Sequence, residues 1–195
     1  MNSREKILAA VKKNKPVLTD LPETKLFERT DVELIPHFKE VLESIGGKLV
    51  EVAYGTSLEE AIITTCPDMS TICSTIPDIN VANVDINITE VKDPHDLKGV
   101  DLAIIKGEFG VAENAAIWVT EEDMGQRALP FITQHLAIVL EKASFVWNMH
   151  QAYTKLDARE AGFGVFIAGP SKTADIEQSL VIGAHGPRSL SVFLV

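Results

Sequence analysis

The densest group of polar side chains in the sequence lies in two glycine–proline turns near its carboxyl end. The first turn, GPSKT, spans residues 169–173, and the second, HGPR, spans residues 185–188. Lysine and arginine supply positive charge, while hydroxyl groups and backbone amides donate hydrogen bonds, which is the chemistry of an anion-binding loop. The spacing of a phosphate-binding P-loop is absent. The two turns therefore predict a pocket for a small anionic metabolite.

Asp175 and Glu177 follow the first turn and have two interpretations. A short helix capped by Thr173 would hold both carboxylates in its first turn, where the helix dipole favours negative charge. Alternatively, they orient Lys172 or Arg188 around a bound anion. The helix explains neither Lys172 nor the second turn, so the sequence favours the pocket.

A second polar pair, Glu113 and Asn114, lies between small or apolar residues directly before a hydrophobic run. A carboxylate in such a place is costly to bury unless it is paired or used in chemistry. Glu113 is therefore a candidate acid or base, with Asn114 binding it or a ligand. An exposed loop glutamate is an equally good interpretation.

Arg127 and His135 flank the connector before the next strand-like run. Arginine binds carboxylates and phosphates through two hydrogen bonds, and histidine exchanges protons near neutral pH. Read alone, a surface ion pair and a structural histidine are the commoner roles for such residues.

The elements that must position these side chains follow from the apolar pattern. Spacings of three and four between Leu34 and Ile45 predict a helix that ends at Gly46, and Ser57 with Glu60 forms a capping box for the next helix. Helices and strands alternate in the first half, which favours a mainly parallel sheet with helices on both faces. The second half adds the strand-like runs AAIWVT, HLAIVLE, GFGVFIAG and LSVFLV.

The length of 195 residues suits one α/β domain, predicted over residues 31–195. Residues 1–30 are predicted as a helix, capped by Ser3, and a polar connector. The formal charge of −10 disfavours nucleic acid as a partner. No apolar run approaches the roughly 18 residues of a membrane span, and no secretory signal is present, so a cytoplasmic location is expected.

Cofactor motifs are missing from the sequence. Cys66 and Cys73 are the only two cysteines and cannot supply the four thiolates of an iron–sulfur cluster. Neither GxGxxG nor HExxH occurs, so no nicotinamide cofactor or metal site is predicted and the cofactor stays unknown. Any redox step then requires a partner subunit or an added cofactor.

The stretch GPSKTADIEQSLVIGAHGPRSLSVFLV closely resembles the carboxyl-terminal signature of the lactate-utilisation, or LUD-domain, family. GVAENAAIWV and RALPFITQHLAIV are similar to two of its upstream segments. The resemblance implies a three-layer αβα fold with a mainly parallel or mixed sheet, shared with glucosamine-phosphate isomerases, ribose-phosphate isomerases and CoA transferases. The positions that match the family's polar residues are Glu113, Arg127, His135, Ser171, Lys172, Thr173, Asp175, Glu177, His185 and Arg188.

The resemblance also implies a function. Small members without iron–sulfur motifs assist the oxidation of L-lactate, or a related hydroxy acid, to pyruvate alongside iron–sulfur partner proteins. Two alternatives stay open: an acyl-CoA transferase or sugar-phosphate isomerase that uses Glu113, and a non-catalytic scaffold or regulator that senses an anion. Asn114 and Ala115 replace the family's usual hydroxyl–glycine pair. Whether the chain is itself an enzyme, and whether it forms a homo-oligomer, stays open.

Overall fold

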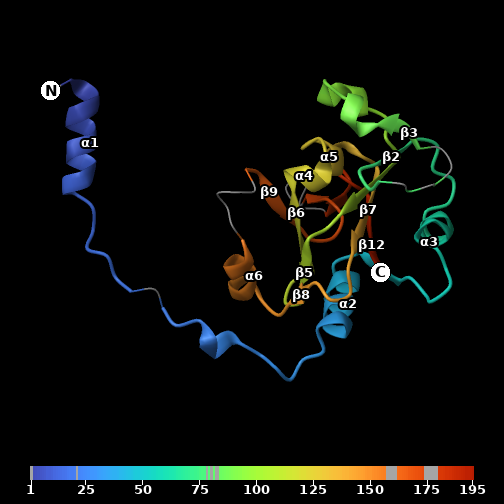
Figure 1. The fold of residues 1–195 in the computed structure, drawn as a ribbon, viewed down its shortest axis with the longest axis horizontal. Helices are drawn as coiled ribbons and strands as arrows, with labels where there is room; N and C mark the ends of the chain where they lie inside the picture. The colour runs from blue at the N-terminus through green and yellow to red at the C-terminus, as the bar shows by residue number, and fades with distance from the viewer. Residues whose placement is uncertain are drawn as a thin grey trace.

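The computed structural model describes residues 2–20, 22–77, 79, 81, 84–156, 162–173 and 180–195. Two β-sheets and a projecting hairpin form its strands, and helices pack around the larger sheet (Figure 1). Within these residues, no helix combines the length and the apolar character that crossing a bilayer requires.

The larger sheet has six strands, and every neighbouring pair is parallel. In spatial order they are β1 (Lys48–Glu51), β12 (Ser189–Leu194), β7 (His135–Leu140), β4 (Leu102–Lys106), β2 (Ile72–Ser74) and β3 (Val84–Asn87). Parallel strands are covered on both faces and therefore read as continuous apolar runs. In β4, the residues from Leu102 to Ile105 are all fully buried. The mainly parallel α/β fold predicted from the sequence is confirmed.

Most helix ends follow the capping signals in the sequence. The helices are α1 (Ser3–Lys13), η1 (Lys25–Phe27), α2 (Leu34–Ser44), α3 (Leu58–Thr65), η2 (Ile88–Glu90), η3 (Pro94–Leu97), α4 (Glu121–Met124), α5 (Leu129–Ile132) and α6 (Met149–Lys155). Ser57 and Glu60 form the predicted capping box of α3. Gly46, just beyond α2, has the left-handed φ of 86° that such an end favours. The cap of α1 is Asn2 rather than the predicted Ser3.

Helices cover both faces of the larger sheet, because successive side chains of a strand point to opposite sides. On one face, Ile105 of β4 packs in a core with Phe38 of α2. On the other face, Ile104 packs in a second core with Ile62 of α3. This arrangement is the flanked sheet that the resemblance implied.

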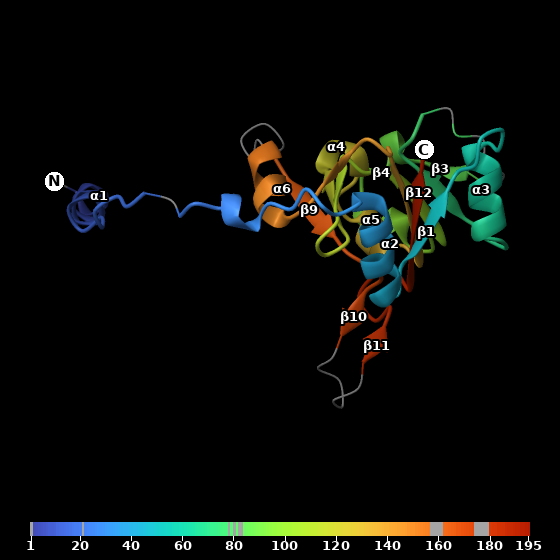
Figure 2. The same ribbon diagram turned by 90° about the horizontal axis from the view of Figure 1, so that it is seen from below.

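The smaller sheet packs against the α2 side of the larger one, since Val119 of β6 shares the core of Ile105. Its strands, in spatial order, are β8 (Phe145–Val146), β5 (Phe109–Val111), β6 (Ala116–Thr120) and β9 (Gly164–Ile167). The hairpin of β10 (Lys172–Thr173) and β11 (Val181–Ile182) follows β9 and projects from the domain (Figure 2). The strand-like runs predicted in the second half are thus divided between two sheets.

The amino-terminal segment contacts the domain through Phe27, close to where the segment ends. α1 has no buried residue and lies apart from both sheets in both views (Figures 1 and 2). The ring of Phe27 stacks on His150 with centroids 5.3 Å apart. The Phe27 carbonyl accepts hydrogen bonds from Trp147 Nε1 and Asn148 Nδ2. The division into residues 1–30 and a domain of residues 31–195 stays a prediction.

Gly107 lies between β4 of the larger sheet and β5 of the smaller sheet, and it allows a test of how closely the two sheets pack. A Cβ added to Gly107 would lie 2.6 Å from Cγ2 of Ile117 and 2.9 Å from Cγ2 of Ile138, which are fully buried. We expect Gly107→Ala to lower the free energy of unfolding by about 1–3 kcal/mol, because stiff β-branched side chains must shift. Urea unfolding followed by circular dichroism measures the change.

Gly99→Ala is the matched control for this test. Gly99 has a φ of 96°, and nothing lies within 4 Å of an added Cβ, so alanine meets backbone strain there without a clash. Its expected cost is about 1 kcal/mol. A Gly107→Ala protein as stable as the wild type would show that the sheets do not approach as closely as described.

Candidate functional site

The two glycine–proline turns lie side by side. The amide of Ser171 donates to the carbonyl of Pro187 at 2.8 Å, and the amide of Gly183 donates to the carbonyl of Ser171 at 3.0 Å. A Cβ added to Gly186 would lie 3.0 Å from the Cβ of Ser171, so the second turn approaches the first closely there. Gly169, with a φ of 69°, provides the bend that leads into the first turn.

Lys172 and Thr173 leave the first turn as strand β10, paired with Ile182 and Val181 of β11. The Lys172 side chain is exposed, and its Nζ donates a hydrogen bond to the carbonyl of Ile45, the C-cap residue of α2. A cation at a helix carboxyl end is favoured by the helix dipole. Lys172 therefore has a structural partner that fixes where its charge lies.

The second turn enters the larger sheet beside the start of β7, which is His135. The amide of Arg188 donates to the carbonyl of Gln134 at 2.8 Å. Nδ1 of His135 and the hydroxyl of Ser189 form a hydrogen bond of 2.7 Å. The register of β7 and β12 pairs the same two residues. His135 thus belongs to the same edge of the sheet as the two turns.

Arg188 and His185 are exposed side chains of the second turn. Over the described ranges, with residues 157–161 and 174–179 left out, neither side chain has a hydrogen bond or an ion pair. Arg188 packs beside Gly183, because a Cβ added there would lie 2.4 Å from Cγ of Arg188. Asp175 and Glu177, the predicted orienting carboxylates, lie outside the described residues.

Sequence reasoning missed Asp101 at this edge. Its carbonyl accepts from the His135 amide at 2.7 Å, and its carboxylate accepts from the Ser70 hydroxyl and from the amides of Ser70 and Thr71. The Ser70 hydroxyl is the main cause that holds the pKa of Asp101 below its ordinary value. Asp101 directly precedes a buried run, as His135 opens another, and parallel pairing aligns such strand starts.

Glu113 and Asn114 form the turn between β5 and β6, and no hydrogen bond or ion pair among the described residues joins them to the glycine–proline turns. Glu113 Oε2 accepts from the Met149 amide, the first residue of α6, at 3.0 Å. Asn114 Oδ1 accepts from the Ala116 amide at 3.1 Å. Ala115 is fully buried with a φ of 55°, a left-handed conformation that glycine adopts more easily.

Arg127 lies between α4 and α5, and its contacts are with residues that adjoin the smaller sheet. Its guanidinium forms an ion pair with Glu121 and lies over the ring of Phe163, 5.1 Å from the centroid. The structure therefore brings together Ser171, Lys172, His135 and Arg188, while the described contacts of Glu113 and Arg127 lie elsewhere.

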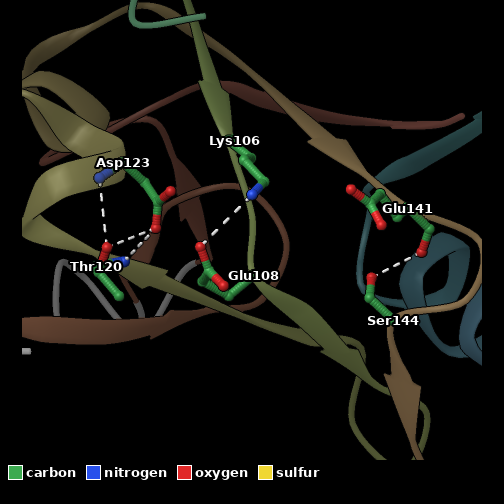
Figure 3. A network of polar contacts seen from close by, with 6 residues as sticks. All are labelled: Lys106, Glu108, Thr120, Asp123, Glu141 and Ser144. Carbon is green, nitrogen blue, oxygen red and sulfur yellow. Dashed lines mark hydrogen bonds and ion pairs between the residues drawn. The ribbon is translucent and has the colours of Figure 1, made fainter.

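The opposite, carboxyl edge of the larger sheet holds a cavity of about 290 Å³ that the sequence did not predict. Lys106 ends β4, and Glu141 directly follows β7, so both line the cavity from neighbouring strands. Asp123 of α4 lines it as well, and Figure 3 shows all three side chains. We refer to it below as the carboxyl-edge cavity.

Comparison with known proteins gives a consistent family. The LUD domain matches residues 35–195. "Lactate utilization protein C" of Bacillus pumilus is 33% identical over 91 residues, covering 44% of this chain and 38% of that protein. "Lactate utilization protein C" of a Geobacillus species (strain WCH70) is 26% identical over 205 residues, covering 99% of this chain and 79% of that protein.

The coverage of these relatives differs. The matched region spans less than half of the Bacillus pumilus protein, and 44% of "Lactate utilization protein C 1" of Bacillus mycoides. A solved structure of a DUF162 family protein from Deinococcus radiodurans superposes with a TM-score of 0.67 at 18% identity, covering 89% of this chain and 99% of that one. This likeness supports the fold alone.

The Asp101 contacts predict how stability changes with pH. A carboxyl whose pKa is lowered by folding stabilises the native state above its unfolded value and loses that contribution as the pH falls through the folded pKa. Asp101 has an ordinary value of 3.8, so its contribution should be lost below that pH. Acidification from about pH 6 to about pH 2 should therefore destabilise the wild type more than Asp101→Asn in urea unfolding.

Ser70→Ala refines the pH test, because it removes the largest cause of the lowered pKa while the carboxyl group remains. Its pH dependence should lie between those of the wild type and Asp101→Asn. Identical pH dependences in all three proteins would contradict the role given to this carboxylate.

The Glu113 contact predicts a structural effect. Glu113→Ala should lower the free energy of unfolding by about 1 kcal/mol, since the Met149 amide loses its acceptor. Glu113→Gln keeps an oxygen acceptor there and should cost less. Glu40→Ala, on the exposed side of α2, is the control and should change little. Thermal unfolding that ranks Gln below Ala would refute the capping role.

Proposed function

The chain belongs to the LUD-domain family, and on that premise we propose that it serves in lactate utilisation, assisting the oxidation of L-lactate or a related hydroxy acid to pyruvate. The names of its relatives support this role. The activity of the whole relatives is only proposed for this chain, because the chain matches less than half of several of those proteins.

The hydrogen bond between Ser171 and Pro187 is the observation that carries the proposal. It brings two segments with exposed cations, Lys172 and Arg188, to the base of one hairpin. A hydroxy acid presents a carboxylate, which arginine binds through two parallel hydrogen bonds and lysine through its charge. Ser171 and Thr173 add hydroxyl donors for the same anion.

In this proposal His135 is the base that accepts the proton of the substrate hydroxyl. In the tautomer whose Nδ1–H donates to the hydroxyl oxygen of Ser189, Nε2 is unprotonated and accepts that proton. Oxidation at the carbinol carbon releases two electrons and a second proton beyond that one. We assign them to an acceptor in separate iron–sulfur partner proteins, and this chain would bind and orient the substrate for them.

The thiols of this chain do not fit an iron–sulfur cluster. The sequence has only two cysteines, and a cluster needs four thiolates. Cys73 is fully buried, and burial raises the pKa of its thiol to about 11, so it stays protonated. No step of the proposed reaction therefore runs through a cluster held by this chain. A cytoplasmic location remains part of the proposal, in keeping with two free thiols.

The alternative of a CoA transferase or isomerase that uses Glu113 has less support. Its carboxylate accepts a hydrogen bond from the Met149 amide, and the adjoining turn carries Ala115 in a left-handed conformation. The scaffold or sensor alternative shares the anion site and differs only in lacking chemistry, so it is tested by the same variants.

Calorimetric titration with L-lactate tests the site, and L-lactamide, which lacks the carboxylate, serves as the ligand control. Lys172→Met and Arg188→Met should each weaken lactate binding by about tenfold or more, because each removes a charge-assisted contact. Lys142→Met, at the opposite edge of the larger sheet, should bind as the wild type does. Circular dichroism of each variant separates loss of binding from loss of fold.

Equal binding of lactate by the wild type and both charge variants would overturn the anion site. If lactate binds as proposed, His135→Gln distinguishes a catalytic role of this chain from a sensing role. The assay is lactate-dependent electron transfer by a complex reconstituted with the iron–sulfur proteins. A proton-accepting His135 requires a fall in rate with binding retained, and an unchanged rate makes this chain a sensor.

A further inference from the structure

The carboxyl-edge cavity lies where open parallel sheets commonly bind ligands, beyond the carboxyl ends of the strands. All six strands run the same way, so the ends of β2, β4, β7 and β12 meet at this edge. Residues at these ends or up to two positions beyond them line the cavity, among them Ile76, Lys106, Glu141 and Val195. Its volume of about 290 Å³ suits a small organic molecule.

One wall of the cavity is apolar. Ile76 and Pro77 come from the segment after β2, Val139 from β7, and Val195 from the residue after β12. Val139 is buried and belongs to the α3-side core, whereas the other side chains reach solvent. An aliphatic group placed against them would remove apolar surface from water.

Lys106 and Glu141, which carry opposite charges, border this apolar wall and form no ion pair with each other. Lys106 Nζ lies 3.8 Å from Glu108 Oε1, longer than a hydrogen bond, and both side chains are about half exposed. Across the described ranges, the Glu141 carboxylate has no hydrogen bond or ion pair. Figure 3 shows Lys106 on β4, with its ammonium group directed toward Glu108, and Glu141 after β7.

Asp123, another acidic lining residue, is held by the fold. The Asp123 carboxylate accepts from the amide and the hydroxyl of Thr120, at 3.0 and 2.6 Å, as the capping box of α4. The carbonyl of Glu141 accepts from the hydroxyl of Ser144 at 2.7 Å, so this bond holds the turn without using the carboxylate. Lys106, Glu141 and the exposed Glu122, which also lines the cavity, are thus the charges available to a ligand.

We propose that the carboxyl-edge cavity binds a small zwitterion of the α-amino acid class with an aliphatic side chain. The ligand carboxylate pairs with Lys106, its ammonium group pairs with Glu141, and its side chain lies against Ile76 and Val139. A ligand with one charge satisfies only half of this pair. Acidic lining residues outnumber the single lysine, which disfavours a simple anion.

This site is separate from the proposed lactate site, which lies at the amino edge of the sheet. Its test uses L-leucine and its hydroxy analogue, 2-hydroxy-4-methylpentanoate, in which a hydroxyl replaces the ammonium group. Isoamylamine, which lacks the carboxylate, completes the set. Each probe is titrated into the full-length protein carrying Arg188→Met, because the hydroxy analogue is itself a hydroxy acid that the proposed lactate site would bind. Calorimetry and ligand-observed nuclear magnetic resonance measure the affinities.

We expect L-leucine to bind at least about tenfold more tightly than either single-charge analogue. Lys106→Met and Glu141→Gln should each weaken leucine binding by a similar factor. Lys39→Met and Glu40→Gln make the same chemical changes on the exposed side of α2 and should leave binding unchanged. Lactate binding should survive the cavity variants, which keeps the two proposals distinguishable.

Three results would overturn the inference. The first is an affinity for the hydroxy analogue equal to that for leucine, since the ammonium group would then be irrelevant. The second is leucine binding that both cavity variants retain in full. The third is no binding of leucine at millimolar concentration by a protein that is folded by circular dichroism.

Discussion

The parallel direction of six strands is the constraint on which both sites depend. It places every strand start at one edge of the larger sheet and every strand end at the other. His135 and Ser189 are therefore neighbours although a long stretch of sequence separates them, and so are Lys106 and Val139. Reversal of any one strand would move its terminal polar residue to the wrong edge. Burial of β4 and β7 on both faces makes such a reversal costly.

The smaller sheet uses its polar residues differently. Glu113 accepts from α6, Arg127 pairs with Glu121, and Asn114 holds the turn that contains Ala115. These contacts fix where α6 and the strand β9 lie relative to the core. Glu113, which resembles a reactive group in the sequence, thus has a contact that joins the smaller sheet to α6, and this capping bond accounts for a charged side chain between apolar residues.

The sequence predicted what local chemistry determines. The capping box at Ser57, the left-handed glycine after α2 and the buried run of β4 each depend on neighbouring residues. The allocation of strands to two sheets depends on pairing between distant segments, which apolar runs of similar composition do not reveal. The same limit applies to Asp101 and to the carboxyl-edge cavity, whose members become neighbours only when the parallel register is set.

The anchoring of Phe27 on His150 and Trp147 has a consequence for the segment before it. Residues 14–24 join this anchor to α1, and a fully extended chain of that length reaches about 35 Å. α1 therefore stays within a limited distance of the domain, and so do its exposed side chains Ile7 and Val11. Tethering of this kind raises the effective concentration of a binding element into the millimolar range, so even a weak contact surface on α1 would be occupied often.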